Sequence, residues 1–355
     1  MRTGKNKIMA LCAKFKSPLC QQARRFCGGK ISLAFLALFI LFILSFFFDL
    51  SSGSNDISFV NCVKALFGSG ENDAVLIIKS IRLPRVLAAA IVGAGLAASG
   101  CVFQGILRNP LAEPFTLGVS GGAAFGASLA LLLKLSSVSV FFVPFCSFCG
   151  SFISVSAVYI LSGQKRFDSN AMILSGVVMS YIFSSAVMLV YSLFSAAQIQ
   201  AAFIWIMGDF SAVDERLLFA AGAVIIAGTI FLCLSGNVVN AVSLGSEKSK
   251  TIGVEAERAV KIIFLTASLI AACAASVCGV IGFIGLMTPH IMRKIIGANH
   301  FALIPASALL GASFLPFCDA IARTVFAPSM LPVGVITGIF GGIFFMFLLT
   351  RNKKS

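Results

Sequence analysis

The stretch Ile31–Phe48, ISLAFLALFILFILSFFF, decides the fold class, because it runs for 18 residues without a charge. A helix needs roughly 20 mostly apolar residues to cross the hydrocarbon core of a bilayer, which is about 30 Å thick. The rest of the 355-residue chain has the same character, since 59% of it is hydrophobic and 11% is charged. Soluble proteins average about 45–50% hydrophobic residues and about 25% charged residues. The sequence therefore predicts an all-α, polytopic membrane protein and excludes an ordinary cytosolic enzyme.

Eight further apolar runs follow, near residues 86–107, 117–133, 140–162, 171–195, 216–235, 259–281, 301–318 and 332–349. Nine spans would place the basic C-terminus opposite the basic N-terminus, which the positive-inside tendency disfavours. The segment Phe283–Ile296, although Pro289 interrupts it, restores the parity as a short tenth span. We expect about ten transmembrane helices in a single domain, residues 31–350, between cytoplasmic tails 1–30 and 351–355.

The formal net charge of +14 is unevenly distributed. Residues 1–30 contain eight Lys or Arg and no acid, and the predicted cytoplasmic stretches together hold nearly all of the excess positive charge. A cleaved signal peptide is the alternative for the N-terminus, but its apolar core is usually only about 7–15 residues long. The charge therefore indicates membrane orientation, with both termini cytoplasmic, and no nucleic-acid partner is expected.

The eleven cysteines do not form a visible disulfide framework, since most lie inside apolar runs. Cys146 and Cys149 have C-x-x-C spacing, but no second pair, histidine or acid accompanies them. We interpret them as small buried apolar residues.

Glycines recur at every fourth position in two runs. On a helix this spacing puts them on one face, where two helix backbones approach closely. Such faces are typical of tight helix packing, and they also allow helices to slide in an alternating-access protein. The two runs are Gly118, Gly122, Gly126 and Gly334, Gly338, Gly342.

Gly118–Gly122 also fits the G-x-S-x-G pattern, in which Ser120 would be a nucleophile. His290 is the candidate partner in an intramembrane serine hydrolase. Small residues generate this pattern by chance and no carboxylate accompanies the pair, so this is the weakest functional reading.

Arg82, Arg85 and Arg323 lie on the predicted outer side, where the positive-inside tendency disfavours them. They can snorkel to the interface or pair with acids such as Glu71, Asp73 or Asp319. Alternatively, they form an electropositive docking surface for an acidic soluble partner, because arginine pairs with carboxylates through two parallel hydrogen bonds.

The predicted inner side has two polar segments. The turn Arg108–Pro114 contains two prolines and cannot be a continuous helix. The charged stretch at about 243–258 is either a solvated loop or a docking element for a cytoplasmic protein. No G-x-x-x-x-G-K-[ST] phosphate loop is present, so ATP-driven work requires another chain. No span carries the paired acids of ion-coupled carriers, which argues against a stand-alone secondary carrier or channel.

Four segments carry a family resemblance: RLPRVLAAAIVGAGLAASGCVFQGILRNPLAEPFTLGVSGG (Arg82–Gly122), GFIGLMTPHIMR (Gly282–Arg293), DAIAR (Asp319–Arg323) and LPVGVITG (Leu331–Gly338). They strongly resemble the permease subunits of bacterial ABC importers for ferric siderophores, haem and cobalamin. The resemblance implies the type II importer permease fold with ten membrane helices. It covers the chain, in order, from about residue 80 onward.

The resemblance also implies roles for single residues. Arg82, Arg85 and Arg323 would meet glutamates of a substrate-binding protein, and Ser169 and Asn170 would lie at a cytoplasmic gate. The segment Ser243–Val254 corresponds to the loop that couples the permease to its ATPases, although Glu247–Lys250 make it unusually polar. The coupling residues are then Leu244, Gly245, Ser246, Glu247 and Gly253.

The function implied is alternating-access import of a metal chelate across the bacterial inner membrane, foremost a ferric siderophore, with haem and cobalamin left open. The implied partners are two ATP-binding subunits, a periplasmic or lipid-anchored binding protein, and a second permease copy, identical or a close paralogue. ATP and Mg²⁺ would bind to the ATPases, and no cofactor, metal or catalytic residue is expected in this chain.

Overall fold

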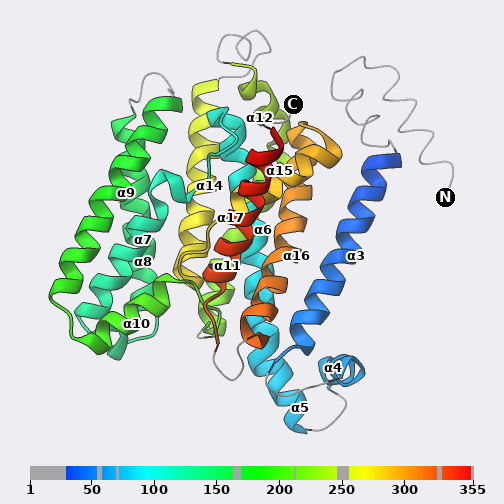
Figure 1. The fold of residues 1–355 in the computed structure, drawn as a ribbon, viewed down its shortest axis with the longest axis vertical. Coiled ribbons are helices and arrows are strands. Elements are labelled where there is room, and N and C mark those ends of the chain that lie inside the picture. The colour runs from blue at the N-terminus through cyan, green and yellow to red at the C-terminus, as the bar shows by residue number, and fades with distance from the viewer. Residues whose placement is uncertain are drawn as a thin grey trace.

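A computed structural model describes residues 29–53, 58–68, 72–162, 169–211, 213–245, 256–325 and 330–352, and within these ranges it contains helices and no strand (Figure 1). Eight helical segments are long and apolar enough to cross a membrane. Each overlaps a predicted run, although the segment that ends with α6 begins 14 residues before its run, at Asn72. They are α3 (Gly29–Ser51), the continuous segment of α5 (Asn72–Leu76), η1 (Ile77–Arg82) and α6 (Leu83–Leu107), then α8 (Phe142–Leu161), α9 (Ser169–Ser192), α11 (Glu215–Leu234), α14 (Ala256–Cys278), α16 (His300–Thr324) and α17 (Val333–Asn352).

Two shorter helices complete the ten expected segments. α15 (Ile284–Ile296) is the predicted short span and contains Pro289. α7 (Val119–Leu132) has 14 residues and is shorter than its apolar run, because the run begins with the 3₁₀ turn η2 (Phe115–Leu117) and with Gly118 at φ 85°.

Three short helices were not predicted from the apolar runs: α4 (Phe59–Leu66), α10 (Ala196–Ile206) and α12 (Gly236–Ser243). Local capping explains where two of them begin. The Ser58 hydroxyl accepts a hydrogen bond from the backbone N–H of Asn61 at the start of α4. Ser195 and Gln198 form a capping box at the start of α10. Such signals are local and do not depend on hydropathy.

The two ends of the helical bundle differ in what they carry. α3 begins, and α17 ends, at the end where α12 lies (Figure 1). α4, α5 and α10 lie at the opposite end (Figure 1). We call these the inner and outer ends, following the orientation that the charge pattern predicts.

α6 is the central helix, and glycines let its backbone touch two neighbours. A Cβ atom added to Gly93 would lie 2.3 Å from the carbonyl oxygen of Gly311 in α16. One added to Gly100 would lie 2.0 Å from that of Gly285 in α15. No real side chain tolerates such distances, so α6, α15 and α16 form one tightly packed group.

The two predicted glycine faces behave differently. A Cβ on Gly122 or Gly126 would lie within 2.3 Å of a backbone oxygen of α8, so the α7 face packs as predicted. Of the three glycines of the predicted α17 face, Gly334 is packed this way, against the Met207 carbonyl at 2.1 Å. Gly338 and Gly342 have no described atom within 4 Å of the added Cβ. The second face is therefore largely open in a single chain.

Candidate functional site

Arg85, in the first turn of α6, forms a two-point ion pair with Asp319 of α16. Its Nε donates to Oδ2 at 2.7 Å and its Nη2 to Oδ1 at 2.8 Å. The same Nη2 lies 3.5 Å from Oδ1 of Asp209, in the turn after α10. Asp319 is fully buried and Arg85 is only 6% exposed. The planar guanidinium suits this paired geometry, which fixes α6 against α16 at the outer end.

Arg323, one helical turn after Asp319, ties α16 to α3. Its Nη2 donates to the carboxylate of Asp49 and, at 2.8 Å, to the backbone carbonyl of the same residue. Its Nη1 donates to the Ser52 carbonyl at 3.1 Å, and its Nε lies 3.2 Å from Oδ2 of Asp319. Asp319 is thus shared between two arginines, and Asp49 is fully buried beside the second.

Arg82 ends the π-helical turn η1 and reaches the last turn of α3. Its Nη1 donates to the carbonyl oxygens of Leu50 and Ser51, both at 2.9 Å. The C-terminal end of a helix carries partial negative charge and favours a cation. The residue is 4% exposed, so its charge is also held inside the outer end of the molecule.

The three predicted docking residues therefore lie at the same end of the molecule, but they bind groups of their own chain: Arg85 and Arg323 pair with aspartates, and Arg82 donates to backbone carbonyls. We call the six residues Arg82, Arg85, Arg323, Asp49, Asp209 and Asp319 the outer Arg–Asp cluster. Its formal charges cancel, and its arginines are 4–7% exposed. Pairing with Asp319, the alternative raised from the sequence, is present for Arg85 and Arg323. A role in docking stays a prediction, and Glu71 lies outside the described residues.

Sequence reasoning missed Asp49 and Asp209 as partners. Asp49 directly follows the first apolar run, and an acid at the end of a span requires a partner if it is buried. The position of Asp49 in the sequence therefore indicates that it needs a cationic partner. The position of Asp209 depends on how the turn after α10 returns toward α6, which the sequence does not reveal.

At the inner end, the structure describes only the first two predicted coupling residues. Leu244 is 57% exposed, directly after α12, and Gly245 has φ 108°. Ser246, Glu247 and Gly253 lie outside the described residues. A Cβ on Gly245 would be 3.7 Å from Nη1 of Arg108, so the turn after α6 approaches the start of this loop.

α12 is fastened to the start of α16 by three side chains, which we call the inner clamp: Asn240, Asn299 and His300. Nδ2 of Asn240 donates to Oδ1 of Asn299 at 2.7 Å. Oδ1 of Asn240 accepts from the backbone N–H of His300 at 2.8 Å and lies 2.9 Å from its Nδ1. No pattern in the sequence predicts this contact. The inner clamp connects the helix before the predicted coupling loop to α16, whose last turn belongs to the outer Arg–Asp cluster.

Ser169 and Asn170, the predicted gate residues, are the first two residues of α9. Ser169 is half-buried and Asn170 is exposed. Both lie at the inner end, where α9 begins (Figure 1). Their role in gating stays a prediction.

Glu113 is a buried acid whose burial the sequence did not predict. It lies in the turn after α6, is 8% exposed, and its carboxyl group is near enough to the backbone N–H of Phe283, which precedes α15, for that N–H to lower its pKa. The positive end of the α15 dipole favours a carboxylate there. Burial outweighs this effect and raises the pKa of Glu113 to about 7. The turn therefore places a buried acid beside the start of α15 as well as joining α6 to α7.

The model of the FecCD transport family matches residues 40–351. The chain belongs to the FecCD transport family. It is 37% identical over 344 residues to an ABC transporter permease protein of Methanocaldococcus jannaschii, covering 94% of this chain and 98% of the relative. It is 33% identical to the hemin transport system permease protein of Yersinia pestis (92% and 97%). It is 38% identical to the cobalamin import system permease protein of Halobacterium salinarum (81% and 76%).

A solved structure of an inward-facing metal-chelate type ABC transporter has the same fold, with a TM-score of 0.79 and 28% identity over 90% of this chain and 99% of the other. The FecCD chain is thus a multi-pass membrane protein and a transport permease subunit of the metal-chelate type ABC importer family. It is not an enzyme, and its family works with ATPase and substrate-binding partners.

The hydrolase pattern has a structural explanation in this FecCD permease. Ser120, near the start of α7, places its hydroxyl 3.4 Å from the Phe115 carbonyl, to which it donates. The His290 ring packs edge-on against Phe344, and also contacts Phe345, in α17. The described contacts of the two residues therefore serve helix packing and do not join them as a dyad.

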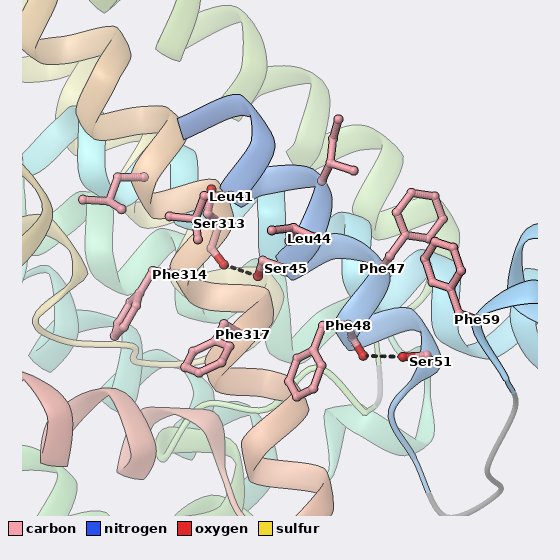
Figure 2. Close-up of a pocket in the computed structure, with 12 residues that line it drawn as sticks. Leu41, Leu44, Ser45, Phe47, Phe48, Ser51, Phe59, Ser313, Phe314 and Phe317 are labelled. Atoms are coloured by element: carbon pink, nitrogen blue, oxygen red, sulfur yellow. Dashed lines mark hydrogen bonds between the residues drawn. The ribbon is translucent and has the colours of Figure 1, made fainter. Parts of the chain in front are cut away.

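An apolar groove of about 720 Å³ lies between α3 and α16 (Figure 2). Phe48, Phe314 and Phe317 lie along it, and its serines are engaged within the chain (Figure 2). The Ser45 hydroxyl donates to the Ser313 carbonyl, and that of Ser51 to the Phe48 carbonyl. Among the described residues that line this groove none is charged, and its serines are occupied within the chain.

Proposed function

We propose that this permease moves an iron chelate, foremost a ferric siderophore, across the bacterial cytoplasmic membrane by alternating access. The observation that carries the proposal is the FecCD match over residues 40–351. Two ATP-binding subunits would supply the energy, and this chain would hold neither nucleotide nor cofactor. The hemin and cobalamin permeases among the relatives keep those two cargoes as alternatives.

The geometry supports a lever built around α16. Its first residue belongs to the inner clamp, and its last turn belongs to the outer Arg–Asp cluster. Between these ends, the close contact of Gly311 with Gly93 holds it against α6. A movement of the loop at 243–258, imposed by the ATPases, would reach the outer end through this packed pair. Both termini would be cytoplasmic.

We further propose that a second permease copy packs along α17. A Cβ added to Gly338 or Gly342 would have no described atom within 4 Å, and only 17% of the residues in the apolar stretch of α17 are buried. Small residues exposed on a membrane helix suit close contact with another helix. The translocation path would lie between the two copies.

Docking of the binding protein at the outer end can be tested at Arg82. Arg85 is less suitable, because reversing its charge would place a third acid beside Asp319 and Asp209. Such a variant would lose docking through misfolding. Arg82→Gln removes the charge and keeps a hydrogen-bond donor for the α3 carbonyls. We expect weaker capture of the purified binding protein, with the melting temperature of the permease retained. Unchanged capture would show that Arg82 does not contribute to docking of the binding protein.

The transport proposal is tested by reconstituting the permease with its ATPases and binding protein in liposomes. ATP-dependent uptake of a ferric siderophore, haem and cobalamin is compared at equal concentration. We expect uptake of the siderophore. Uptake of haem or cobalamin alone would show that this compound, and not a siderophore, is the substrate. Uptake without the ATPase subunits would favour a stand-alone carrier or channel. Transport should survive Ser120→Ala, since the hydrolase alternative alone requires that hydroxyl.

A further inference from the structure

A second groove, of about 480 Å³, lies between the outer halves of α6 and α11. Its walls are apolar. α6 contributes Leu83, Leu87 and Ile91, and α11 contributes Leu218, Phe219 and Ile226. Phe219 is 82% exposed, Ile226 47% and Leu87 39%. In a membrane-spanning chain such walls face hydrocarbon.

The outer mouth of this groove differs from its walls, because it carries one cation and one anion. Lys79 of η1 and Glu215, the first residue of α11, both line it and both are exposed. Neither forms an ion pair within the described part of the chain. Asp214, and not Glu215, caps α11, since its carboxylate accepts from the backbone N–H groups of Arg216 and Leu217. The two charges at the mouth are therefore available to a ligand.

The length of the groove matches one leaflet of a bilayer. Twelve residues separate Lys79 from Ile91, which corresponds to about 18 Å along a helix at a rise of about 1.5 Å per residue. Half of a hydrocarbon core is about 15 Å thick. A charged mouth followed by an apolar channel of one-leaflet length has the dimensions of a phospholipid.

We propose that this groove binds one phospholipid of the outer leaflet, with an acyl chain between α6 and α11, the phosphate at Lys79 and a primary ammonium headgroup at Glu215. The pair of charges selects the headgroup. A purely anionic lipid would be repelled by Glu215, and a choline group has no N–H to donate to its carboxylate. Phosphatidylethanolamine carries both required groups. By contrast, the described residues that line the groove between α3 and α16 include no charged side chain that could select a headgroup.

The test uses the purified, delipidated permease in detergent and measures its melting temperature with added phosphatidylethanolamine, phosphatidylcholine or phosphatidylglycerol at equal mole fraction. A ligand that binds only the folded state raises the melting temperature. We expect the largest rise with phosphatidylethanolamine, and one retained molecule of it by native mass spectrometry. The preference should be lost in Lys79→Gln and in Glu215→Gln, and kept in Lys64→Gln, which changes an exposed lysine of α4 outside the groove.

A groove-filling variant tests the acyl-chain part separately. A Cβ on Gly222 would have its nearest neighbour, Ile91 Cδ1, at 3.6 Å, which is an ordinary contact. Gly222→Leu should therefore fold, fill the groove and abolish the phosphatidylethanolamine-dependent shift. Equal shifts for the three lipids in the wild type would overturn the proposal. The proposal would also be overturned if the double variant Lys79→Gln/Glu215→Gln kept the preference for phosphatidylethanolamine. This variant leaves Gly222 unchanged, so its result does not depend on whether Gly222→Leu folds.

Discussion

At the scale of residues, the outer Arg–Asp cluster shows how buried charges persist here. Arg85 and Arg323 pair with aspartates, and Arg82 donates to carbonyl oxygens at the end of α3. Asp319 serves two arginines and has no exposed surface. Removing one partner of a buried pair leaves an uncompensated charge and costs about 3–5 kcal/mol. We therefore expect Asp319→Ala to lower the free energy of unfolding in detergent by about that amount. Asp73→Asn, at an exposed acid of the same end, should change it by less than about 0.5 kcal/mol. Equal stabilities would show that the cluster does not hold the outer end.

Glu113 gives the second prediction at this scale. Its pKa is raised from 4.5 to about 7 in the folded protein, so between these values the folded state binds more protons than the unfolded state. Stability contributed by the protonated acid is present below about pH 4.5 and is lost as pH rises toward 7, at no more than about 1.4 kcal/mol per pH unit. The free energy of unfolding measured from pH 4.5 to 8 should depend less on pH in Glu113→Gln, whose side chain has the same size and does not titrate. Parallel curves for both proteins would contradict this assignment.

At the scale of elements, hydropathy was sufficient to locate helices but not to pair them. α11 and α16 begin within one residue of their predicted runs, because leaving the hydrocarbon core requires a polar or capping residue. α4, α10 and α12 were missed because they are too short to produce a membrane-length run. The partners in the candidate site were missed for another reason. Asp49 and Arg323 are 274 residues apart, and helix packing alone brings them together.

The inner clamp supports a prediction about coupling between elements, which rests on the proposed function. Asn240→Ala removes both hydrogen-bonding atoms that join α12 to Asn299 and His300. In the reconstituted importer, we expect ATP hydrolysis to continue while chelate uptake per ATP falls several-fold. The matched control is Asn237→Ala on the same helix, since the Oδ1 of Asn237 has no hydrogen-bond partner among the described residues. A proportional loss of hydrolysis and uptake would show that Asn240 serves assembly and not transmission.

At the scale of the whole molecule, the open glycine face of α17 determines whether one chain is a complete unit. Gly338→Phe should leave the single chain folded, because no described atom lies within 4 Å of the added Cβ. If a second copy packs there, the bulky ring separates the helices, and native mass spectrometry should find monomer where the wild type gives dimer. Ile230→Phe, at a 54% exposed position of α11, controls for a new aromatic ring on a membrane-facing helix and should remain dimeric. If the Gly338→Phe variant remains dimeric, the second copy does not pack along this face of α17. If the wild type is monomeric when produced alone, the partner is a paralogous chain.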